Sequence, residues 1–303
     1  MRLRNQTVFV TGVSGTLGDK IAAACVKEGA RVKGLIRGEG QIAICTRLGI
    51  EPVIGDLNDR KTLEQALQGV QFVIHAAAYL GNDRAIAEEV NIRGVQTLVD
   101  AARVAGVERF VQISTVSVYG HFDGAVEIDE SRELAFGHAD VYVSTKSESE
   151  RIVRQAEADG LEVVILRPGL ISSEQNSHWG DRLVTKLADA ENVDWLHPDD
   201  LAPWVHAENV AEMCVLAATV PAAAGQAYNA VDVNYPEREF GLRILQALDK
   251  QPTVPGGDPI LTAYSTGKVV AELGYRPIRT FEETVALLKE QARVRISSPA
   301  SND

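Results

Sequence analysis

The stretch Thr11-Gly12-Val13-Ser14-Gly15-Thr16-Leu17-Gly18 decides the fold of this 303-residue chain. It follows a short apolar run at residues 7–11 and leads into a helical pattern at residues 17–28. Glycines in such a turn let the backbone approach a pyrophosphate, and the helix N-terminus offers free N–H groups and a partial positive charge. In this context the stretch predicts a dinucleotide site. Its expected contacts are Gly12, Ser14, Gly15, Thr16, Leu17 and Gly18.

Short apolar runs alternate with helical patterns over the first two thirds of the chain. The later runs lie at residues 31–37, 52–54, 72–75, 110–113 and 163–166. The helical patterns between them lie at residues 61–67, 84–105 and 143–158. Three more helical patterns follow in the last third of the chain, at residues 207–218, 238–248 and 280–294. This rhythm predicts an α/β fold, a Rossmann-type doubly wound parallel sheet with helices on both faces and right-handed crossovers.

The rhythm changes after Pro168, which predicts two regions. We expect a dinucleotide-binding Rossmann domain over residues 1–170 and a smaller, mainly substrate-binding C-terminal lobe over residues 171–303. Segments around residues 205–235 are expected to return to the Rossmann domain. The last residues, 297–303, read as a frayed tail.

Charge and cysteine usage exclude several classes of partner. The net charge is −12 and no basic run is visible, which argues against nucleic acid and anionic membranes. Cys25, Cys45 and Cys214 are far apart, so no metal site or disulfide framework is expected. No apolar run approaches the roughly 20 residues of a membrane helix, and no leader is visible. We expect a cytoplasmic protein that acts on a small molecule.

The end of the second predicted strand indicates which dinucleotide binds. An NAD site usually places Asp or Glu there for the ribose 2′-hydroxyl. Here the strand ends on Arg37, whose guanidinium suits a 2′-phosphate, and Ser14 could add a hydrogen bond. We therefore expect NADP(H) in preference to NAD(H). The alternative is an exposed arginine beside an NAD site that lacks its acid.

Two further strand ends complete the expected cofactor site. Asp56 and Leu57 follow the third strand, where the carboxylate can accept a hydrogen bond from an adenine amino group. After the fourth strand, small residues let the backbone approach the cofactor, and these are Ala76, Ala77 and Ala78. His75 lies inside the apolar run before them, so we interpret it as structural rather than catalytic.

Tyr142 and Lys146 form a Tyr-x-x-x-Lys pair on a predicted helix. Residues four apart share one helix face, which places an ammonium beside a phenol. A free tyrosine has a pKa of about 10, and a neighbouring positive charge lowers it. The phenol then becomes a usable proton donor or acceptor for a carbonyl or alcohol. Alone, the pair is a common pattern on exposed helix surfaces. The glycine turn upstream favours a catalytic role for the pair.

These motifs resemble the extended short-chain dehydrogenase/reductases. That family contains nucleotide-sugar epimerases and dehydratases, and enzymes similar to dihydroflavonol reductase and 3β-hydroxysteroid dehydrogenase. The resemblance covers roughly residues 5–235. Besides the motifs above it rests on Val90-Asn91-Ile92-Arg93-Gly94, Ile113-Ser114-Thr115-Val116-Ser117-Val118-Tyr119-Gly120, Leu166-Arg167-Pro168-Gly169 and Val205-His206-Ala207-Glu208-Asn209-Val210.

The resemblance implies the roles of several residues. The family's catalytic hydroxyl lies four residues before the Tyr at position 119, which gives Thr115, although Ser114 and Ser117 are close enough to leave the assignment open. Tyr142 would exchange the proton, and Lys146 would also hold the nicotinamide ribose. The remaining roles implied by resemblance are a catalytic Asn91 and a nicotinamide contact from Pro168 and Gly169.

The surroundings of this core indicate the reaction. The family's dehydratases carry an Asp-Glu pair after the catalytic Thr, but this chain has Val116 and Ser117, so an elimination lacks its acid and base. We expect an NAD(P)-dependent oxidoreductase that interconverts a ketone or aldehyde and an alcohol. The first alternative is an NAD-dependent nucleotide-sugar epimerase, whose diphosphate would need basic residues such as Arg182, Lys186, Arg238 and Arg279. The second is a non-catalytic NADP-binding sensor.

Aromatic residues of the lobe indicate a fairly apolar substrate. We expect the pocket walls to include Trp179 and Trp204, with Trp195 nearby and at least one tryptophan in the core. Ser117 and Tyr79 are further candidate substrate contacts, and Leu80, His121 and Phe122 could close the pocket. The resemblance also makes a homodimer a candidate assembly, formed through the helices near residues 84–105 and 140–158.

Overall fold

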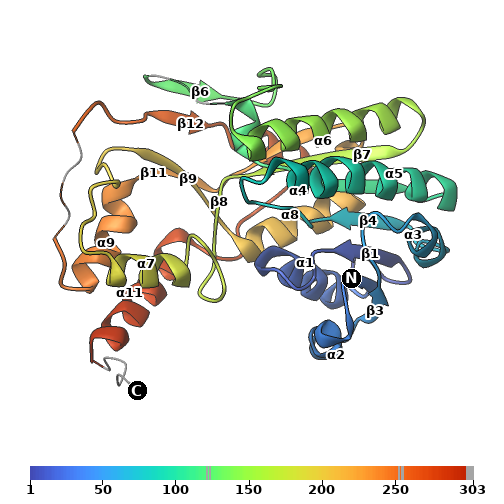
Figure 1. Ribbon diagram of the computed structural model, residues 1–303, viewed down its shortest axis with the longest axis horizontal. Helices are drawn as coiled ribbons and strands as arrows, with labels where there is room; N and C mark the ends of the chain where they lie inside the picture. Colours follow the sequence, from blue (N-terminus) through green and yellow to red (C-terminus); the bar gives the residue numbers. More distant parts are fainter. Residues whose placement is uncertain (121, 123, 252, 254–255, 298–303) are drawn as a thin grey trace.

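A seven-stranded parallel sheet forms the centre of the computed structural model, which describes residues 1–303 except 121, 123, 252, 254–255 and 298–303 (Figure 1). Its strand order is β10-β7-β5-β4-β1-β2-β3. The strands are β1 (Thr7–Thr11), β2 (Arg31–Ile36), β3 (Glu51–Ile54), β4 (Phe72–His75), β5 (Arg109–Ile113), β7 (Glu162–Pro168) and β10 (Ala227–Ala230). The predicted doubly wound fold is confirmed. The strand order reverses next to β1, where such sheets bind their ligands.

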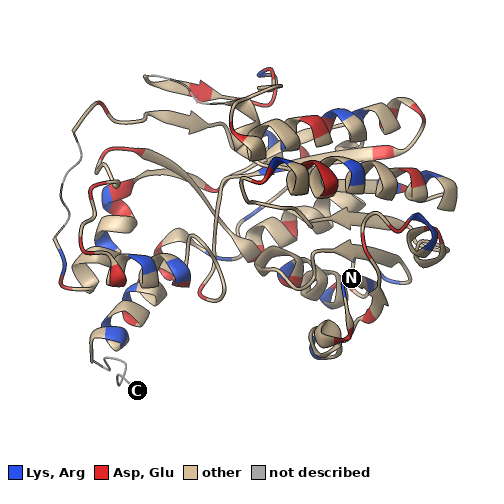
Figure 2. Ribbon diagram, viewed as in Figure 1, with Lys and Arg blue, Asp and Glu red and all other residues tan. Residues whose placement is uncertain are grey.

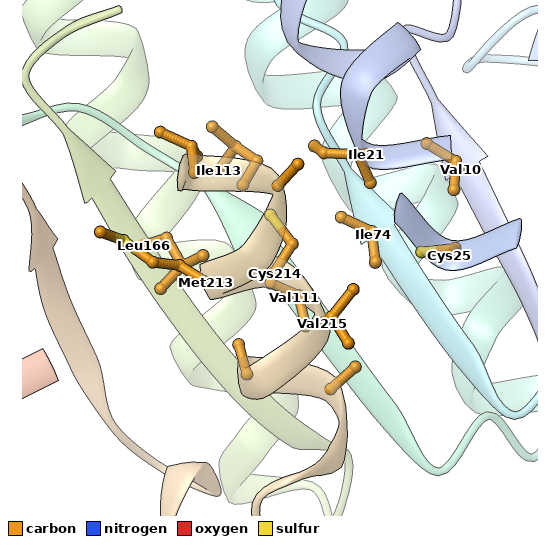
Figure 3. Close-up of a cluster of buried hydrophobic side chains, with 14 of the residues drawn as sticks. Val10, Ile21, Cys25, Ile74, Val111, Ile113, Leu166, Met213, Cys214 and Val215 are labelled. Carbon is orange, nitrogen blue, oxygen red and sulfur yellow. The ribbon is translucent and has the colours of Figure 1, made fainter. Parts of the chain in front are cut away.

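Helices cover both faces of this sheet because successive strand residues point to opposite sides. One face packs against α1 (Thr16–Lys27), α2 (Ile42–Leu48), α8 (Ala207–Thr219) and α10 (Gly267–Leu273). Figure 3 shows part of that cluster, in which α1 and α8 lie side by side. The other face packs against α3 (Arg60–Ala66), α5 (Gly94–Ala105) and α6 (Val141–Ala158). The central strands β1 and β4 carry no Lys, Arg, Asp or Glu (Figure 2).

The lobe has its own sheet and its own core. Strands β8 (Leu170–Ser172), β9 (Leu201–His206) and β11 (Val233–Pro236) form a three-stranded sheet. Helices α7 (Asp181–Asp189), α9 (Gly241–Ala247) and α11 (Phe281–Ser297) pack around it on the left of Figure 1. A separate parallel pair joins β6 (Val126–Ile128) to β12 (Thr262–Tyr264). Between β9 and β11 the chain crosses back to the central sheet. There α8 packs against one face of the sheet, and β10 forms its edge strand.

The structure differs from the predicted helix over residues 84–105 in one respect. A π-helical turn at Glu89–Arg93 separates α4 (Arg84–Glu88) from α5. Such turns cluster at functional sites, and this one contains Asn91. Just after it, a Cβ on Gly94 would lie 2.9 Å from Cβ of Leu57, so the absence of a side chain lets α5 approach the turn after β3.

Several short elements were missing from the sequence prediction. They are α2, α7, α10, β10 and the strands of the two small sheets, each of three to nine residues. Among the described residues, no helix combines the length and apolarity needed to cross a bilayer. Within the same residues no group of three or more His, Cys, Asp or Glu side chains could hold a metal ion.

Helix α5 offers a test of which face carries the core. Leu98 is fully buried, whereas Val104 on the same helix is 65% exposed. We expect Leu98→Ala to lower the free energy of unfolding by about 2–5 kcal/mol, because it leaves a cavity between α5 and the sheet. Val104→Ala, the control, should change it by less than about 0.5 kcal/mol. Urea unfolding of both variants measures the difference, and equal effects would contradict the packing.

Candidate active site

The glycine turn brings two backbone segments together at the C-terminal edge of the sheet. Gly12 has φ +74°, and a Cβ there would lie 2.9 Å from the carbonyl carbon of Ala76. A Cβ on Gly18 would lie 2.0 Å from the Gly12 oxygen. Gly15 caps α1 in an extended conformation and no side chain accepts the first amides of the helix. The turn therefore presents bare backbone and a helix N-terminus, as an anionic ligand requires.

Thr11 ties the first strand to the fourth. Its Oγ1 accepts hydrogen bonds from the amides of Ala76 (3.2 Å) and Ala77 (3.1 Å). The same hydroxyl is hydrogen-bonded to Nδ1 of His75 at 2.7 Å. Burial lowers the pKa of His75 to about 3, and Lys146 adds to the effect, so the ring is neutral. His75 is completely enclosed beside Thr11, as expected for a structural histidine.

The expected adenosine contacts lie at neighbouring strand ends. Arg37 follows β2 and is exposed, and its side chain has no ion-pair partner among the described residues. Its amide donates to Oε1 of Gln41 (2.9 Å). Asp56 is exposed after β3 and uses Oδ1 to accept the amide of Asn58 (3.0 Å), while Leu57 is buried. Ser14 is exposed in the glycine turn.

Tyr142, Thr115 and Lys146 meet at the end of β5. Asp140 caps the start of α6 by accepting the amide of Val143 (3.0 Å), which places Tyr142 in the first turn. The Thr115 side chain lies close enough to the phenol of Tyr142 to lower its pKa. Lys146 is buried one turn further along, and its Nζ donates to the carbonyl oxygen of Ile113 (2.7 Å). Ile113, the last residue of β5, thus contacts Lys146, and Thr115, two residues later, lies beside Tyr142.

The pKa values of the pair differ from the sequence-based expectation. Burial of the phenol end raises the pKa of Tyr142 to about 12, and the Thr115 side chain opposes that shift. Burial lowers the pKa of Lys146 to about 8, against an opposing effect of Glu150. The expected lowering of the Tyr142 pKa by Lys146 is corrected here, because burial of the phenol has the larger effect and raises the pKa. At neutral pH Tyr142 keeps its proton and can donate it.

The structure separates the three candidate hydroxyls. Thr115 caps the 3-10 turn at Val116–Tyr119, where its Oγ1 accepts the amide of Ser117 (3.2 Å) and lies 3.2 Å from the Ser117 hydroxyl. Ser117 is half-buried beside it. The Ser114 hydroxyl is buried and has no hydrogen-bond partner among the described residues. Thr115 is the one that meets Tyr142.

Asn91, for which the resemblance implies a catalytic role, is buried and held by three hydrogen bonds. Its Oδ1 accepts the amide of Tyr79 (2.8 Å), and its Nδ2 donates to the Tyr79 carbonyl (3.0 Å) and to Oγ1 of Thr145 (3.1 Å). Both amide hydrogens are therefore used, and the side chain is 2% exposed. It fastens the segment Ala76-Ala77-Ala78-Tyr79 to α6 immediately before Lys146.

The end of β7 passes close to the lobe. The amide of Gly169 donates to the carbonyl oxygen of Ala230 (3.3 Å) at the end of β10. A Cβ on Gly169 would lie 2.2 Å from the oxygen of Pro203, so only glycine lets β9 cross here. Pro168 is buried as the last residue of β7. The candidate nicotinamide segment thus lies where the two sheets meet.

The predicted substrate wall is wrong for Trp204. Its indole is 1% exposed in the lobe core and stacks edge-on against Phe281 with ring centroids 5.2 Å apart. Trp179 is half-buried and packs against the same core. Trp195 is 37% exposed under the Lys186 ammonium. An apolar pattern cannot distinguish a pocket wall from a core residue. His121 lies outside the described residues.

Sequence reasoning missed the buried pair Glu150 and Arg167. Oε1 and Oε2 of Glu150 accept from Nε (3.0 Å) and NH2 (2.7 Å) of Arg167. The available signal was spacing, since Tyr142, Lys146 and Glu150 recur at intervals of four along α6. A carboxylate on the face that carries the reactive pair must be paired if that face is buried.

The model of the NAD dependent epimerase/dehydratase family matches residues 8–230. The chain belongs to this family. The resemblance to the extended short-chain dehydrogenase/reductases is thereby confirmed.

Curated relatives include reductases. A 4-hydroxy-2-methyl-3-oxo-4-farnesyl-3,4-dihydroquinoline-1-oxide ketoreductase of Stigmatella aurantiaca is 32% identical over 213 residues. That match covers 69% of this chain and 64% of the relative, so slightly less than two thirds of the relative is spanned. A 2-alkyl-3-oxoalkanoate reductase of Shewanella oneidensis is 28% identical over 295 residues, 91% of this chain and 74% of the relative.

Similar solved structures are a dehydratase and an epimerase. A dTDP-glucose 4,6-dehydratase of Streptomyces venezuelae with NAD bound has a TM-score of 0.80 at 25% identity, over 96% of this chain and 98% of that one. A UDP-glucose 4-epimerase of Thermus thermophilus in complex with NAD has a TM-score of 0.78 at 24% identity, over 95% and 99%. The second likeness shows the fold alone.

The buried lysine predicts a pH dependence of stability. The pKa of Lys146 falls from 10.5 in the unfolded chain to about 8 in the fold, so the unfolded chain binds more protons between these values. Because protonation favours the unfolded chain in this range, the free energy of unfolding increases as the pH rises from about 8 to 10.5. Between pH 8 and pH 10.5, the free energy of unfolding of the wild type should increase by about 3 kcal/mol relative to that of Lys146→Met. Urea unfolding at both pH values measures this, and a constant difference would contradict it.

Proposed function

We propose that this chain is an NADP(H)-dependent oxidoreductase that interconverts a ketone or aldehyde and an alcohol on a fairly apolar small molecule. The observation that carries the proposal is the contact of the protonated Tyr142 phenol with the Thr115 hydroxyl, one turn from the buried Lys146. A carbonyl oxygen held by both hydroxyls would receive a hydrogen bond from Thr115 and a proton from Tyr142. Lys146 would hold positive charge beside them.

The glycine turn fits a dinucleotide. Gly12 and Gly18 leave no space for a Cβ, and the α1 N-terminus has no side-chain cap. These features support binding of a pyrophosphate by backbone N–H groups. When bound, the nicotinamide would supply the hydride. Pro168 and Gly169 are proposed to lie along its carboxamide, and Ala76, Ala77 and Ala78 along its backbone side.

Arg37 supports the preference for NADP(H). Its guanidinium is exposed at the end of β2 without an ion-pair partner among the described residues, whereas Arg2, Arg60 and Arg93 each pair with a carboxylate. A charge kept free at the strand tip suits a 2′-phosphate. Glu39 begins the next turn and is also exposed, and its carboxylate is the group that would favour NAD instead.

The reductase proposal is favoured over elimination and epimerisation. After Thr115 the chain has the buried apolar Val116 and the hydroxyl of Ser117, neither of which can serve as a carboxylate acid or base. The basic residues that a sugar diphosphate would need are already engaged. Arg182 bonds Asn176, Lys186 lies over Trp195, Arg238 pairs with Asp199, and Arg279 pairs with Glu174 and Glu208. We therefore keep the epimerase only as an outcome of the assay below.

The names of the relatives support an apolar substrate. One reduces a farnesylated dihydroquinoline oxide and another is named for 2-alkyl-3-oxoalkanoates, and both names describe a ketone that bears a hydrocarbon chain. Half-buried Trp179 and exposed Leu80 offer apolar surface. A sensor that has lost chemistry is disfavoured, because Thr115, Tyr142 and Lys146 are all in place.

Cofactor selectivity tests the role of Arg37. We expect Arg37→Ala to weaken NADPH binding by about 10- to 100-fold, because a charged hydrogen bond to the 2′-phosphate is lost. NADH binding should change by less than about twofold, and Arg151→Ala, an exposed arginine on α6 paired with Glu148, should affect neither. Fluorescence titration of both cofactors measures the change. Equal affinity of the wild type for NADPH and NADH would refute the preference.

Turnover tests the role of Tyr142. We expect Tyr142→Phe to lower kcat on ketones by about 100- to 10,000-fold while NADPH affinity is kept, because general acid catalysis is lost. Tyr228→Phe on β10, whose hydroxyl binds Glu272, is the matched control and should keep its activity. Consumption of NADPH with a panel of ketones measures kcat, and UDP-sugars with NAD form a second panel. Retained turnover in Tyr142→Phe, or activity on UDP-sugars alone, would overturn the assignment.

A further inference from the structure

The Glu150–Arg167 pair is buried at the end of β7, beside the candidate active site. The side chains of Arg167 and Glu150 are only 6% and 2% exposed. Both carboxylate oxygens are used by the guanidinium fork, a geometry that offsets much of the desolvation of the two charges. A buried pair of this kind adds little net stability compared with apolar residues of similar size. Its presence therefore calls for a reason other than stability.

A chain of hydrogen bonds extends from this pair. NH1 of Arg167 donates to the Tyr119 hydroxyl (2.8 Å), and the guanidinium carbon lies 4.9 Å from the centre of that ring. The Tyr119 hydroxyl donates to Oδ1 of Asn229 (2.7 Å). Nδ2 of Asn229 donates to the carbonyl oxygens of Ile128 and Ser265, each at 3.2 Å. All the polar atoms of this chain are therefore paired.

The members of the chain come from the segments that carry the candidate chemistry. Glu150 lies on α6, one turn beyond Lys146 and two beyond Tyr142. Tyr119 ends the 3-10 turn that Thr115 caps. Arg167 directly precedes Pro168 in β7. One buried cluster therefore connects the phenol helix, the hydroxyl turn and the strand end. We call Glu150, Arg167 and Tyr119 the buried cluster.

We propose that the buried cluster positions Tyr142, Lys146 and Thr115 relative to one another, and that the Glu150 carboxylate keeps the Lys146 ammonium charged. The first part rests on the proposed function, because it assumes that these three groups act on a carbonyl. None of the cluster residues needs to touch the substrate. A shift of about 1 Å between reacting groups costs up to about 100-fold in rate, so a rigid connection between the three segments has a measurable value.

The charge around Lys146 supports the second part. Glu150 raises the pKa of Lys146 against the opposing effect of burial. His75, across the interface on β4, is neutral at working pH and supplies no positive charge. Tyr142 on the same helix is protonated and also neutral. Glu150 is thus the carboxylate that lies one turn away from Lys146 on the same helix face, and Arg167 holds both of its oxygens in the interior.

A pair of double variants separates positioning from folding. Glu150→Leu with Arg167→Met removes both buried charges together, which a fold tolerates far better than the loss of one. The matched control is Arg109→Met with Glu162→Leu. Arg109 and Glu162 join the N-terminal ends of β5 and β7, which are the ends far from the candidate site. NH2 of Arg109 lies 2.7 Å from Oε2 of Glu162, and the arginine side chain is 9% exposed. Like the Glu150–Arg167 pair, the control pair engages Nε and NH2 of a buried arginine, but its glutamate is 53% exposed.

We expect the cluster double variant to fold, to bind NADPH within about threefold of the wild type and to lose about 10- to 100-fold in kcat. The control double variant should keep kcat even if its melting temperature falls. Equal kcat in the cluster variant and the wild type would overturn the positioning role. If the cluster variant does not fold, Tyr119→Phe decides, because it removes a single oxygen. It should lower kcat several-fold with unchanged NADPH affinity, and an unchanged kcat would overturn the role.

A second readout is independent of the proposed reaction. The side-chain ¹⁵N resonance of Lys146, assigned by its loss in Lys146→Met, reports directly on protonation of the ammonium. We expect it to titrate at lower pH in the cluster double variant and at the wild-type pH in the control. Unchanged titration in the cluster variant would refute the electrostatic part. A wild type that reduces no carbonyl would refute the proposed function, while the titration would still confirm or refute the role of Glu150.

Discussion

The close approach of two backbone segments at the carboxyl edge of the sheet is the constraint on which the rest of the site depends. The turn after β1 and the segment after β4 approach so closely that a Cβ on Gly12 would collide with Ala76. The Thr11 hydroxyl holds them together with two amide hydrogen bonds, and His75 orients that hydroxyl. The strand order reverses here, and the helices that follow β1 and β4 cover opposite faces of the sheet. Sheets of this type bind their ligands at such a point.

Burial then determines the chemistry of the candidate groups. Desolvation raises the pKa of Tyr142 to about 12 and lowers that of Lys146 to about 8. At neutral pH the phenol is therefore protonated, and the pKa of the ammonium lies only about one unit above the pH. The Thr115 side chain and the carboxylate of Glu150 oppose these shifts. A proton donor with a cation beside it suits reduction of a carbonyl. The positions after Thr115 lack the carboxylates that would suit elimination.

The lobe contributes mainly by its contacts with the sheet. Gly169 lets β9 cross the end of β7, and the Thr16 hydroxyl at the start of α1 donates to the carbonyl oxygen of Asn176 in the lobe. Glu174, just before it, is held by His206 and Arg279, and the bond from His206 lowers the pKa of its carboxyl group to about 2. The segment after β8 is thereby fastened over the glycine turn. The lobe can therefore influence cofactor as well as substrate.

The sequence by itself determined the fold and the position of the glycine turn. Glycines 12, 15 and 18 and the alternating apolar runs have local causes, namely backbone sterics and strand burial, and local causes can be read from neighbouring residues. The Tyr142–Lys146 spacing predicted a shared helix face for the same reason. Only the tertiary structure decided that Trp204 belongs to a core, that Asn91 anchors Tyr79, and that Glu150 meets Arg167 from another element. It also reversed the expected pKa shift of Tyr142. Those facts depend on which distant segments exclude water from a side chain, and neither pattern nor spacing contains that information.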